Sequence, residues 1–458
     1  MAEVDRLADF VVGTDWAQLS KQASEQLAIR VLDTIGVAVA ALDAGPTRAV
    51  RALTEQLGGT GSATLIGGGA APPDRAAFYN TALSRYLDFM DSYLAPGETC
   101  HPSDNVGAVL AAAESVGASG RDFLTALAVA YQVQTRLSDV APVRARGFDH
   151  TVQGAYAVPA GVSRALGLSA EQTANAIAIS GTANNALRVT RTGDLSNWKG
   201  LAYPQVAKEG VHAALLARAG ITGPRQVFEG NKGFRQTIAG DFEIDWSAED
   251  LEGVTRTIVK KHNAEIHSQT TLEAAIEIAR RPGFDPARIR RVGVTTFQVA
   301  YDIIGGGEEG DKRSIRTKEE ADHSLPYLVA VALLDGVVEP AQFAPDRVVA
   351  ADVQALLGRV QISPDDGFTA RFPQEMPSRV EVEMDDGTTL TASASSYLGA
   401  RTDPLDWSAA MEKYRRLVVP FTGPELAEAV AEAVRTLDER PVTVMTTLLA
   451  QVPLARTS

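Results

Sequence analysis

The chain has 458 residues, with 57 acidic and 43 basic side chains, a formal net charge of −14 and a single cysteine. Such an acidic surface repels phosphate backbones and anionic lipid, which argues against nucleic acid or a membrane as a partner. One cysteine excludes an internal disulfide, a thiolate zinc site and an iron–sulfur cluster held by several thiolates of this chain. The length predicts two or three domains.

The first half of the chain has the spacing of amphipathic helices. Apolar residues from Leu27 to Leu42 recur three and four positions apart until Gly45-Pro46, which predicts a helix within residues 15–42. A helical hairpin is predicted over 103–137 with a break at 117–120, and helices rich in small residues follow over 168–180 and 203–220. The start of the chain lacks a basic leader and its most apolar stretch is too short to span a bilayer, so we expect a cytoplasmic protein.

After about Ser268 the pattern changes. Residues 288–304 predict a strand, and residues 378–395 alternate apolar and polar side chains on either side of an Asp386-Gly387 turn, which indicates a β-hairpin. The tail from Asp406 to Leu449 returns to helical spacing. The sequence therefore predicts a mainly α protein, with a helical domain formed by 1–265 together with 405–458 and a smaller α+β domain over 266–404.

The segment "DFMDSYLAPGETCHPSDN", residues 88–105, concentrates reactive groups. His101 stands on a loop just before a predicted helix start, where backbone N–H groups favour anions such as a substrate carboxylate. Asp88 is near His101 in sequence and would raise the basicity of its imidazole. The structural alternative is that Asp88 and Asp91 only cap or orient the loop.

Two further segments gather cations. "RVTRTGDLSNWKG" supplies Arg188, Arg191, Ser196 and Lys199, which could bind carboxylates or form a solvated charged loop. "KKHNAEIHSQTTLEAA" places Lys260, Lys261, His262 and His267 ahead of a helix whose predicted capping box is Thr270 with Glu273.

The other histidines are ambiguous from the sequence. His150 precedes a helix and is equally well explained as a structural residue. His212 lies in an apolar helical pattern, which favours a core or surface position. His323 precedes Ser324 and Pro326 at a helix start, where capping explains the serine as well as catalysis would.

Familiar cofactor motifs are absent from the sequence. "GGTGSATLIGGG" lacks the strand and the third glycine of a dinucleotide fingerprint, and "GGGEEGDK" has Asp311 where a phosphate loop needs lysine. No pair of histidines has the HExxH spacing of a zinc site. We therefore expect no metal and no cofactor.

Several separated stretches, in order, resemble the MmgE/PrpD family. They are "YLDFMDSYLAPGETCHPSDNVGAVLAAAE", "GFDHT", "ALRVTRTGDLSNWKG", "GITGPRQVFEGNKGF", "AEIHSQTTLEAA" and "DHSLPYLVAVALLDG". The resemblance covers nearly the whole chain and is strongest to the 2-methylcitrate dehydratase branch. It departs from the family at Met90, where relatives usually have Asn or Asp, and at His262-Asn263, which replaces an aromatic-proline pair.

The resemblance implies a large helical domain, a smaller α+β lid domain, a homodimer, and cofactor-free dehydration of a tricarboxylate such as 2-methylcitrate or citrate in propionate catabolism. The family's active-site positions fall on these residues of this chain: Asp88, Ser92, His101, His150, Lys199, Lys260 and His267. Ser92 stands where the family commonly has threonine, which keeps the hydroxyl. The resemblance leaves open cis-aconitate decarboxylation, dicarboxylate epimerisation, and binding of an acid metabolite without turnover.

Dehydration needs a proton removed beside a carboxylate and another delivered to the leaving hydroxyl, each transfer being worth about 10²–10⁴-fold. His101, tuned by Asp88, is our first hypothesis for one transfer, and His150 or His267 for the other. Fixed cations would stabilise the enolate-like charge, a role we expect for the following residues: Lys199, Lys260, Arg188 and Arg191. Ser92 and Ser196 would hold substrate carboxylates by hydrogen bonds.

Overall fold

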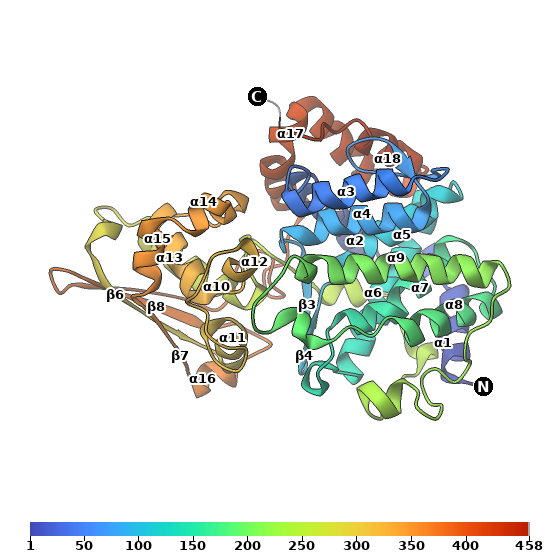
Figure 1. Cartoon of the computed structure of the whole chain (residues 1–458), viewed down its shortest axis with the longest axis horizontal. Coiled ribbons are helices and arrows are strands. Elements are labelled where there is room, and N and C mark those ends of the chain that lie inside the picture. The colour runs from blue at the N-terminus through green and yellow to red at the C-terminus, as the bar shows by residue number, and fades with distance from the viewer. Residues whose placement is uncertain (457–458) are drawn as a thin grey trace. The chain divides into compact units, whose positions relative to one another are not determined.

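The computed structural model describes residues 1–456 and divides into two compact units (Figure 1). The first unit contains residues 1–190, 200–257 and the chain from 406 onward, and the second contains residues 191–199 and 258–405. The sequence analysis placed 191–199 and 258–265 in the helical domain, whereas the structure groups both segments with the second unit.

The first unit is built almost wholly of helices. Its helices are α1 (Glu3–Gly13), α2 (Lys21–Ala40), α3 (Gly45–Leu57), α4 (Pro73–Tyr86), α5 (Val106–Ser115), α6 (Gly120–Val140), α7 (Thr151–Ala165), α8 (Ala170–Ala183), α9 (Trp198–Arg218), α17 (Trp407–Arg435) and α18 (Thr443–Leu449). The first two residues of α9 group with the second unit. Short strands β1 (Ala63–Thr64) and β2 (Ala70–Ala71) pair antiparallel. The glycine-rich stretch over 58–69 thus contains the short strand β1 between two loop segments.

Helix α2 shows why the apolar spacing predicted a helix. Leu27, Val31 and Ile35 are almost fully buried, and α2 packs against α4 and the C-terminal α17. The helix begins at Lys21 because the Ser20 hydroxyl accepts a hydrogen bond from the amide of Ala23 (3.0 Å). The tail therefore packs back on the first unit, as its helical spacing suggested.

Small residues allow α6 and α7 to pack closely. Gly161 of α7 lies against Ala126 and Ala130 of α6, and a Cβ at Gly161 would come within 2.8 Å of the Ala130 Cβ. Gly154, also on α7, leaves room in the same way for the ring of Tyr203. Close approach of backbones in this bundle thus depends on glycine at particular positions.

A hairpin positions the His101 loop. Strands β3 (Asp91–Ala95) and β4 (Glu98–Cys100) pair antiparallel across a turn in which Gly97 has a positive φ of 77°. His101 then caps a short 3-10 turn, η2 (Pro102–Asn105), which leads into α5. The predicted helix start after His101 is confirmed.

The second unit is an α+β fold around a four-stranded sheet (Figure 1). Its strands β6 (Ile289–Thr296), β7 (Val360–Pro364), β8 (Ser378–Met384) and β9 (Thr389–Ala394) lie in the order β7-β6-β8-β9. β6 and β7 are parallel, and the other two pairs are antiparallel. A two-residue strand, β5 (Ile258–Val259), starts the unit's main segment.

Helices cover the sheet, and those from α11 to α15 lie between the parallel strands β6 and β7 in the chain. They are α10 (Gln269–Ala279), α11 (Gln298–Ala300), α12 (Lys318–Ala321), α13 (Leu325–Asp335), α14 (Pro345–Val348), α15 (Ala351–Leu357) and α16 (Asp366–Thr369). α10 packs on β8 and β9, while α13 packs on α10 and β7. The core of this unit lies between these helices and the apolar face of the sheet.

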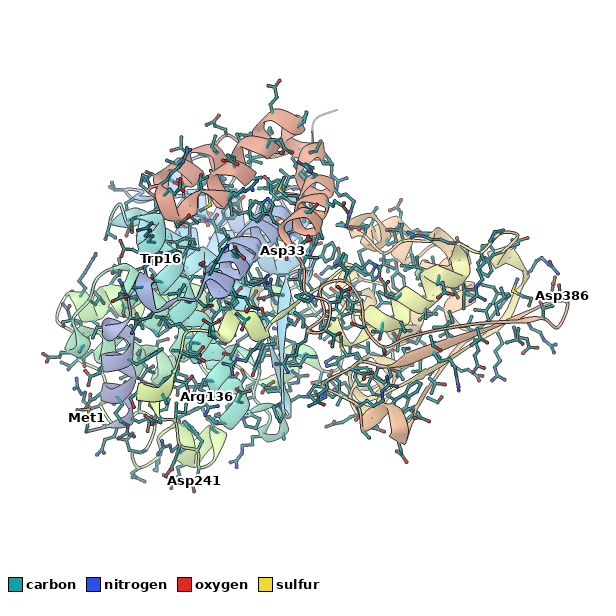
Figure 2. The ribbon with its side chains drawn as sticks, turned by 180° about the vertical axis from the view of Figure 1, so that it is seen from behind. Met1, Trp16, Asp33, Arg136, Asp241 and Asp386 are labelled. Atoms are coloured by element: carbon teal, nitrogen blue, oxygen red, sulfur yellow. The ribbon has the colours of Figure 1, made fainter. Side chains whose placement is uncertain are left out.

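The predicted hairpin is confirmed. Val380 and Val382 of β8 are fully buried and pair with Ala392 and Leu390 of β9. The turn carries Asp386, labelled in Figure 2, and Gly387 at a φ of 82°. The predicted strand over 288–304 is too long, because β6 ends at Thr296 and a helical turn follows.

Helix starts in the second unit correct one prediction and confirm another. Ser324 caps α13, its hydroxyl accepting from the amide of Tyr327 (3.1 Å) with proline in the first turn. The Thr270–Glu273 capping box is wrong, because α10 begins one residue before Thr270 and Glu273 binds His262. Within residues 1–456, no helix is both long and apolar enough to cross a membrane.

Candidate active site

The His101 imidazole in the first unit is held in one orientation. Its Nδ1 lies 2.8 Å from the backbone carbonyl oxygen of Asp91 and 3.1 Å from the Ser92 hydroxyl. Because a carbonyl oxygen only accepts hydrogen bonds, Nδ1 carries the proton and donates it. The neutral ring then has its lone pair on Nε2, so Nε2 is the atom suited to take up a proton. The side chain is buried, with 7% of its surface exposed.

Asp91 organises this loop from a fully buried position. One carboxylate oxygen accepts from the amide of Ser103 (3.0 Å) and the other from the Tyr131 hydroxyl (2.9 Å), with Arg30 at 3.7 Å. Burial raises the pKa of Asp91, while Arg30 and these hydrogen bonds oppose the rise. The sequence analysis expected a substrate carboxylate at this helix start. In the structure, the Ser103 amide at this start already donates to the carboxylate of Asp91. The structural interpretation of Asp91 is confirmed.

Asp88 forms a buried ion pair with Arg85, their atoms being 2.6 Å apart. Burial lowers the pKa of Arg85, but Asp88 and Asp104 outweigh it and the net shift is upward. The hydrogen-bond acceptor at Nδ1 of His101 is the Asp91 carbonyl, and the expected tuning of His101 by Asp88 stays a prediction. Asp88 also has a positive φ of 55°, an unusual conformation for a residue other than glycine.

Met90, the departure from the family pattern, is fully buried, and its sulfur lies 3.3 Å from the Arg85 guanidinium. Its side chain therefore contacts the residue that pairs with Asp88.

His150 lies beside His101 in the same unit. The two ring centres are 5.3 Å apart in an edge-to-face arrangement. His150 stands just before α7, and its Nδ1 is 3.4 Å from the buried carboxylate of Asp149. The structure thus brings together three predicted residues of the first unit, Ser92, His101 and His150, while Asp88 pairs with Arg85.

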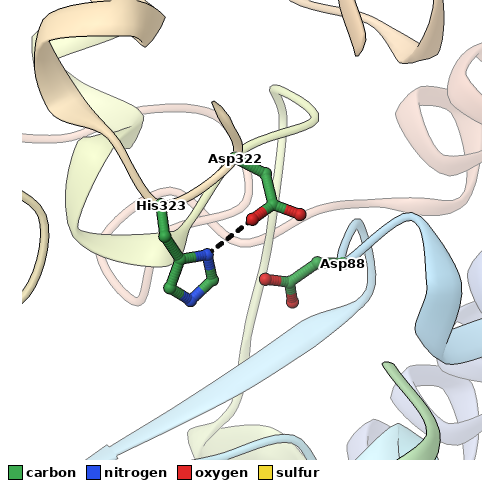
Figure 3. A group of neighbouring side chains, drawn as sticks. All are labelled: Asp88, Asp322 and His323. Carbon is green, nitrogen blue, oxygen red and sulfur yellow. Dashed lines mark hydrogen bonds and ion pairs between the residues drawn. The ribbon is translucent and has the colours of Figure 1, made fainter. Parts of the chain in front are cut away.

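In the second unit, Lys199 pairs with a residue that the sequence analysis did not single out. The Lys199 ammonium forms an ion pair with the fully buried Asp322, and lies 2.9 Å from Nδ1 of His323. The Asp322 carboxylate also binds His323 Nδ1 (2.7 Å, Figure 3) and the Lys318 ammonium (2.6 Å). Burial raises the pKa of Asp322, but Lys199, Lys318 and His323 reverse this and leave the pKa well below its usual range.

A second carboxylate–imidazole pair lies in the same unit. Glu265 accepts hydrogen bonds from Nδ1 and the backbone amide of His267, both at 2.7 Å. Burial raises the pKa of Glu265, but His267, His323 and Lys260 bring it down to about 2. The Glu265 amide donates to the carbonyl of Asp322 (3.1 Å), which joins this pair to the Asp322 cluster. Three predicted residues of the second unit, Lys199, Lys260 and His267, therefore share one network of charges.

The other predicted residues have different surroundings. Arg188 belongs to the first unit and is one of the groups that oppose the burial-driven rise in the pKa of Glu98. Arg191 belongs to the second unit and is buried. Ser196 has an exposed side chain, and its backbone carbonyl accepts from the Lys199 amide (3.0 Å).

Two further histidines have structural surroundings. Nε2 of His262 lies 2.5 Å from the Glu273 carboxylate, which also binds Lys261 (2.8 Å). Burial raises the pKa of Glu273, but hydrogen bonds from His262 and Lys261 lower it to about 2. The side chain of His212 is 51% exposed and lies 3.9 Å from Asp74 at the surface, which agrees with the non-catalytic interpretation.

The sequence analysis missed Arg85, Glu265, Lys318 and Asp322. Glu265 had a local signal, because it stands two residues before His267 and thus within reach of its ring. Asp322 had a weaker one, since it directly precedes His323. Nothing local links Asp322 to Lys199, which lies 123 residues earlier in the chain.

Two protein-family models match most of the chain. The MmgE/PrpD N-terminal domain matches residues 5–247, and the MmgE/PrpD C-terminal domain matches residues 262–439. The chain belongs to the MmgE/PrpD family. The two matched domains meet close to residue 257, where the first unit of the structure gives way to the second.

Curated relatives of this MmgE/PrpD chain carry dehydratase names. It is 28% identical over 430 residues to 2-methylcitrate dehydratase of Escherichia coli K12, covering 86% of this chain and 85% of the relative. It is 29% identical over 396 residues to 2-methylcitrate dehydratase of Cupriavidus necator, covering 79% and 78%. An alkylcitrate dehydratase of a fungal species is 28% identical over 345 residues, covering 69% and 67%.

Proposed function

We propose that this chain is a lyase that dehydrates 2-methylcitrate to the corresponding cis-aconitate. The observation that carries the proposal is the match to proteins named 2-methylcitrate dehydratase over most of both chains. Citrate, which lacks only the methyl group, is the second substrate that the proposal allows. The dehydratase names favour this reaction over decarboxylation, epimerisation and binding without turnover.

The reaction sets two physical demands. The C–H electron pair must become the new C=C bond while a base takes the proton, and the hydroxyl must leave with the C–O electron pair and receive a proton to form water. Negative charge develops on the carboxylate next to the carbon that loses its proton. Fixed cations stabilise that charge more strongly in a site from which water is excluded than in bulk water.

We assign one proton transfer to His101. The support is its fixed tautomer, because the Asp91 carbonyl holds Nδ1–H and directs the chemistry to Nε2. Ser92, whose hydroxyl contacts the same Nδ1, then orients the ring in addition to its predicted part in substrate binding. The neighbouring His150 remains a candidate for the opposite transfer, as does His267. The carboxylate of Asp88, which forms an ion pair with Arg85, belongs to the same unit as His101.

We assign the stabilising cations to the second unit. Lys199 and Lys260 are buried, at 3% and 1% exposure, and buried ammonium groups act in surroundings of low dielectric. Asp322 binds Lys199 directly, and the charge of Lys260 acts on Glu265. Substrate-binding roles for Arg188, Arg191 and Ser196 stay predictions.

The proposal includes three further statements. The chemistry needs no metal or cofactor, since protein cations take the part of a Lewis acid and a single cysteine cannot hold an iron–sulfur cluster. The enzyme acts as a homodimer. Its place of action is the cytoplasm.

The deciding experiment incubates purified, chelator-treated protein separately with 2-methylcitrate, citrate and cis-aconitate. Ultraviolet absorbance follows the alkene, and carbon dioxide release is measured in parallel. Alkene formation from 2-methylcitrate without gas is the expected result. Gas from cis-aconitate would replace the proposal with decarboxylation, and binding by calorimetry without any turnover would replace it with a binding function.

A further inference from the structure

The second unit contains two carboxylate–imidazole pairs with the same local geometry. Nδ1 of His323 lies 2.7 Å from Asp322, and Nδ1 of His267 lies 2.7 Å from Glu265. One backbone hydrogen bond, from the Glu265 amide to the Asp322 carbonyl, joins the pairs. Sequence reasoning assigned a role to His267 and left His323 open, because capping explains the neighbouring Ser324 as well as catalysis would.

The Asp322 carboxylate fixes the tautomer of His323. An ionised carboxylate only accepts hydrogen bonds, so Nδ1 of His323 must carry the proton it donates across 2.7 Å. The Lys199 ammonium lies 2.9 Å from the same nitrogen. An ammonium only donates hydrogen bonds, so Lys199 donates to the Asp322 oxygen that it shares with His323. In the neutral ring of His323, Nε2 therefore carries the lone pair.

Charges of both signs lie around His323. Asp322 supplies one negative charge, while Lys199 and Lys318 both bind that carboxylate and supply two positive charges. Glu265 and Lys260, which act on one another in the same network, balance each other. A neutral imidazole with its lone pair on Nε2 is a proton acceptor.

The two rings differ in their surroundings. His267 is 1% exposed and packs against the rings of Phe297 (centres 5.8 Å apart) and Phe372 (5.6 Å). His323 is 9% exposed and lies beside the ammonium of Lys199. A ring enclosed by aromatic side chains is suited to a structural role, whereas a ring beside a cation that binds substrate is suited to proton transfer.

We propose that His323 is a catalytic base of the dehydration and that Asp322 is its positioning residue. The inference rests on the proposed function and deepens it. In this step the proton moves from substrate carbon to Nε2 of His323, and the C–H electron pair becomes the C=C bond. The hydroxyl leaves with the C–O electron pair and receives a proton from a second group to form water.

The test compares three variants with wild-type enzyme on 2-methylcitrate and on substrate deuterated at the carbon that loses its proton. For His323→Gln we expect kcat to fall at least about 100-fold with KM within about threefold, and the isotope effect on kcat to grow because proton removal becomes limiting. His262→Gln, a change at another imidazole bound to a carboxylate in this unit, should keep kcat within about twofold.

Asp322→Asn tests positioning separately. Nitrogen NMR of the histidine rings should show the Nδ1–H tautomer of His323 in the wild type and a shift toward Nε2–H in the variant, with kcat reduced at least about tenfold. If Asp322→Asn fails to fold, since it leaves two lysines without their partner, His323→Gln still decides the matter, because Asp322 then keeps both lysines.

Three results would overturn the inference. The first is a His323→Gln variant with kcat within threefold of wild type. The second is a rise in KM of more than tenfold with an unchanged isotope effect, which would make His323 a binding residue. The third is an Nε2–H tautomer in the wild type. A wild-type enzyme that leaves 2-methylcitrate unchanged would instead remove the proposed function, and the inference with it.

Discussion

Replacing Glu265 by glutamine gives a sharp test of the charge network in the second unit. The Glu265 side chain is buried and accepts two hydrogen bonds from His267, through the ring and through the backbone amide. A glutamine side chain at this position would keep the shape and could still accept from the amide. What the substitution removes is the negative charge that faces His267, His323 and Lys260.

The magnitude follows from the pKa of Glu265, which falls from 4.5 to about 2 on folding. A folded-state pKa below the unfolded one means that the ionised carboxylate stabilises the fold above pH 4.5, and that this contribution is lost as the pH falls toward 2. At 1.36 kcal/mol per pKa unit the contribution is about 3 kcal/mol at pH 7 and about 1 kcal/mol at pH 3. Glu265→Gln should lower the free energy of unfolding by about these amounts.

Urea unfolding followed by circular dichroism, at several pH values between 3 and 7, measures the effect. Glu277→Gln is the matched control in the neighbouring helix α10, because Glu277 pairs with Arg281 from a position 59% exposed and should cost no more than about 0.5 kcal/mol. A loss in Glu265→Gln that is the same at pH 3 as at pH 7 would refute the reasoning, since a lost shape or packing contact does not titrate.

Lys199→Met should raise KM for 2-methylcitrate at least about tenfold in steady-state assays, and an unchanged KM would remove Lys199 from substrate binding. Gly161→Ala should lower the free energy of unfolding by about 1–3 kcal/mol in urea, because the new Cβ would lie 2.8 Å from Ala130. Ser20→Ala should cost about 1 kcal/mol in the same assay, through the lost cap of α2. Dialysis against a chelator should leave kcat unchanged, and restoration of lost activity by added metal would contradict the metal-free chemistry.

Local patterns predicted the elements of this fold well. The buried face of α2, the hairpin around Asp386 and the cap at Ser324 all depend on residues within a few positions of one another. The Thr270–Glu273 capping box failed because α10 begins two residues earlier than a cap at Thr270 requires, and because Glu273 binds His262 instead.

The sites were predictable only in part. His101 before a helix start was visible in the sequence, but its actual hydrogen-bond acceptor, the Asp91 carbonyl, lies on the opposite strand of a hairpin. The pairing of Lys199 with Asp322 joins residues 123 positions apart and depends on the tertiary fold. A carboxylate that lies beside an imidazole in the fold can be distant from it in sequence. Residue spacing reveals such a carboxylate only when it stands next to the histidine in the chain.

The account stands or falls with proton transfer at His101, so the most direct measurement is kcat for 2-methylcitrate in His101→Gln. The variant should unfold at the same temperature as the wild type within a few degrees, and its kcat should fall at least about 100-fold. A folded His101→Gln enzyme that forms the alkene at a rate within threefold of the wild type would contradict the account.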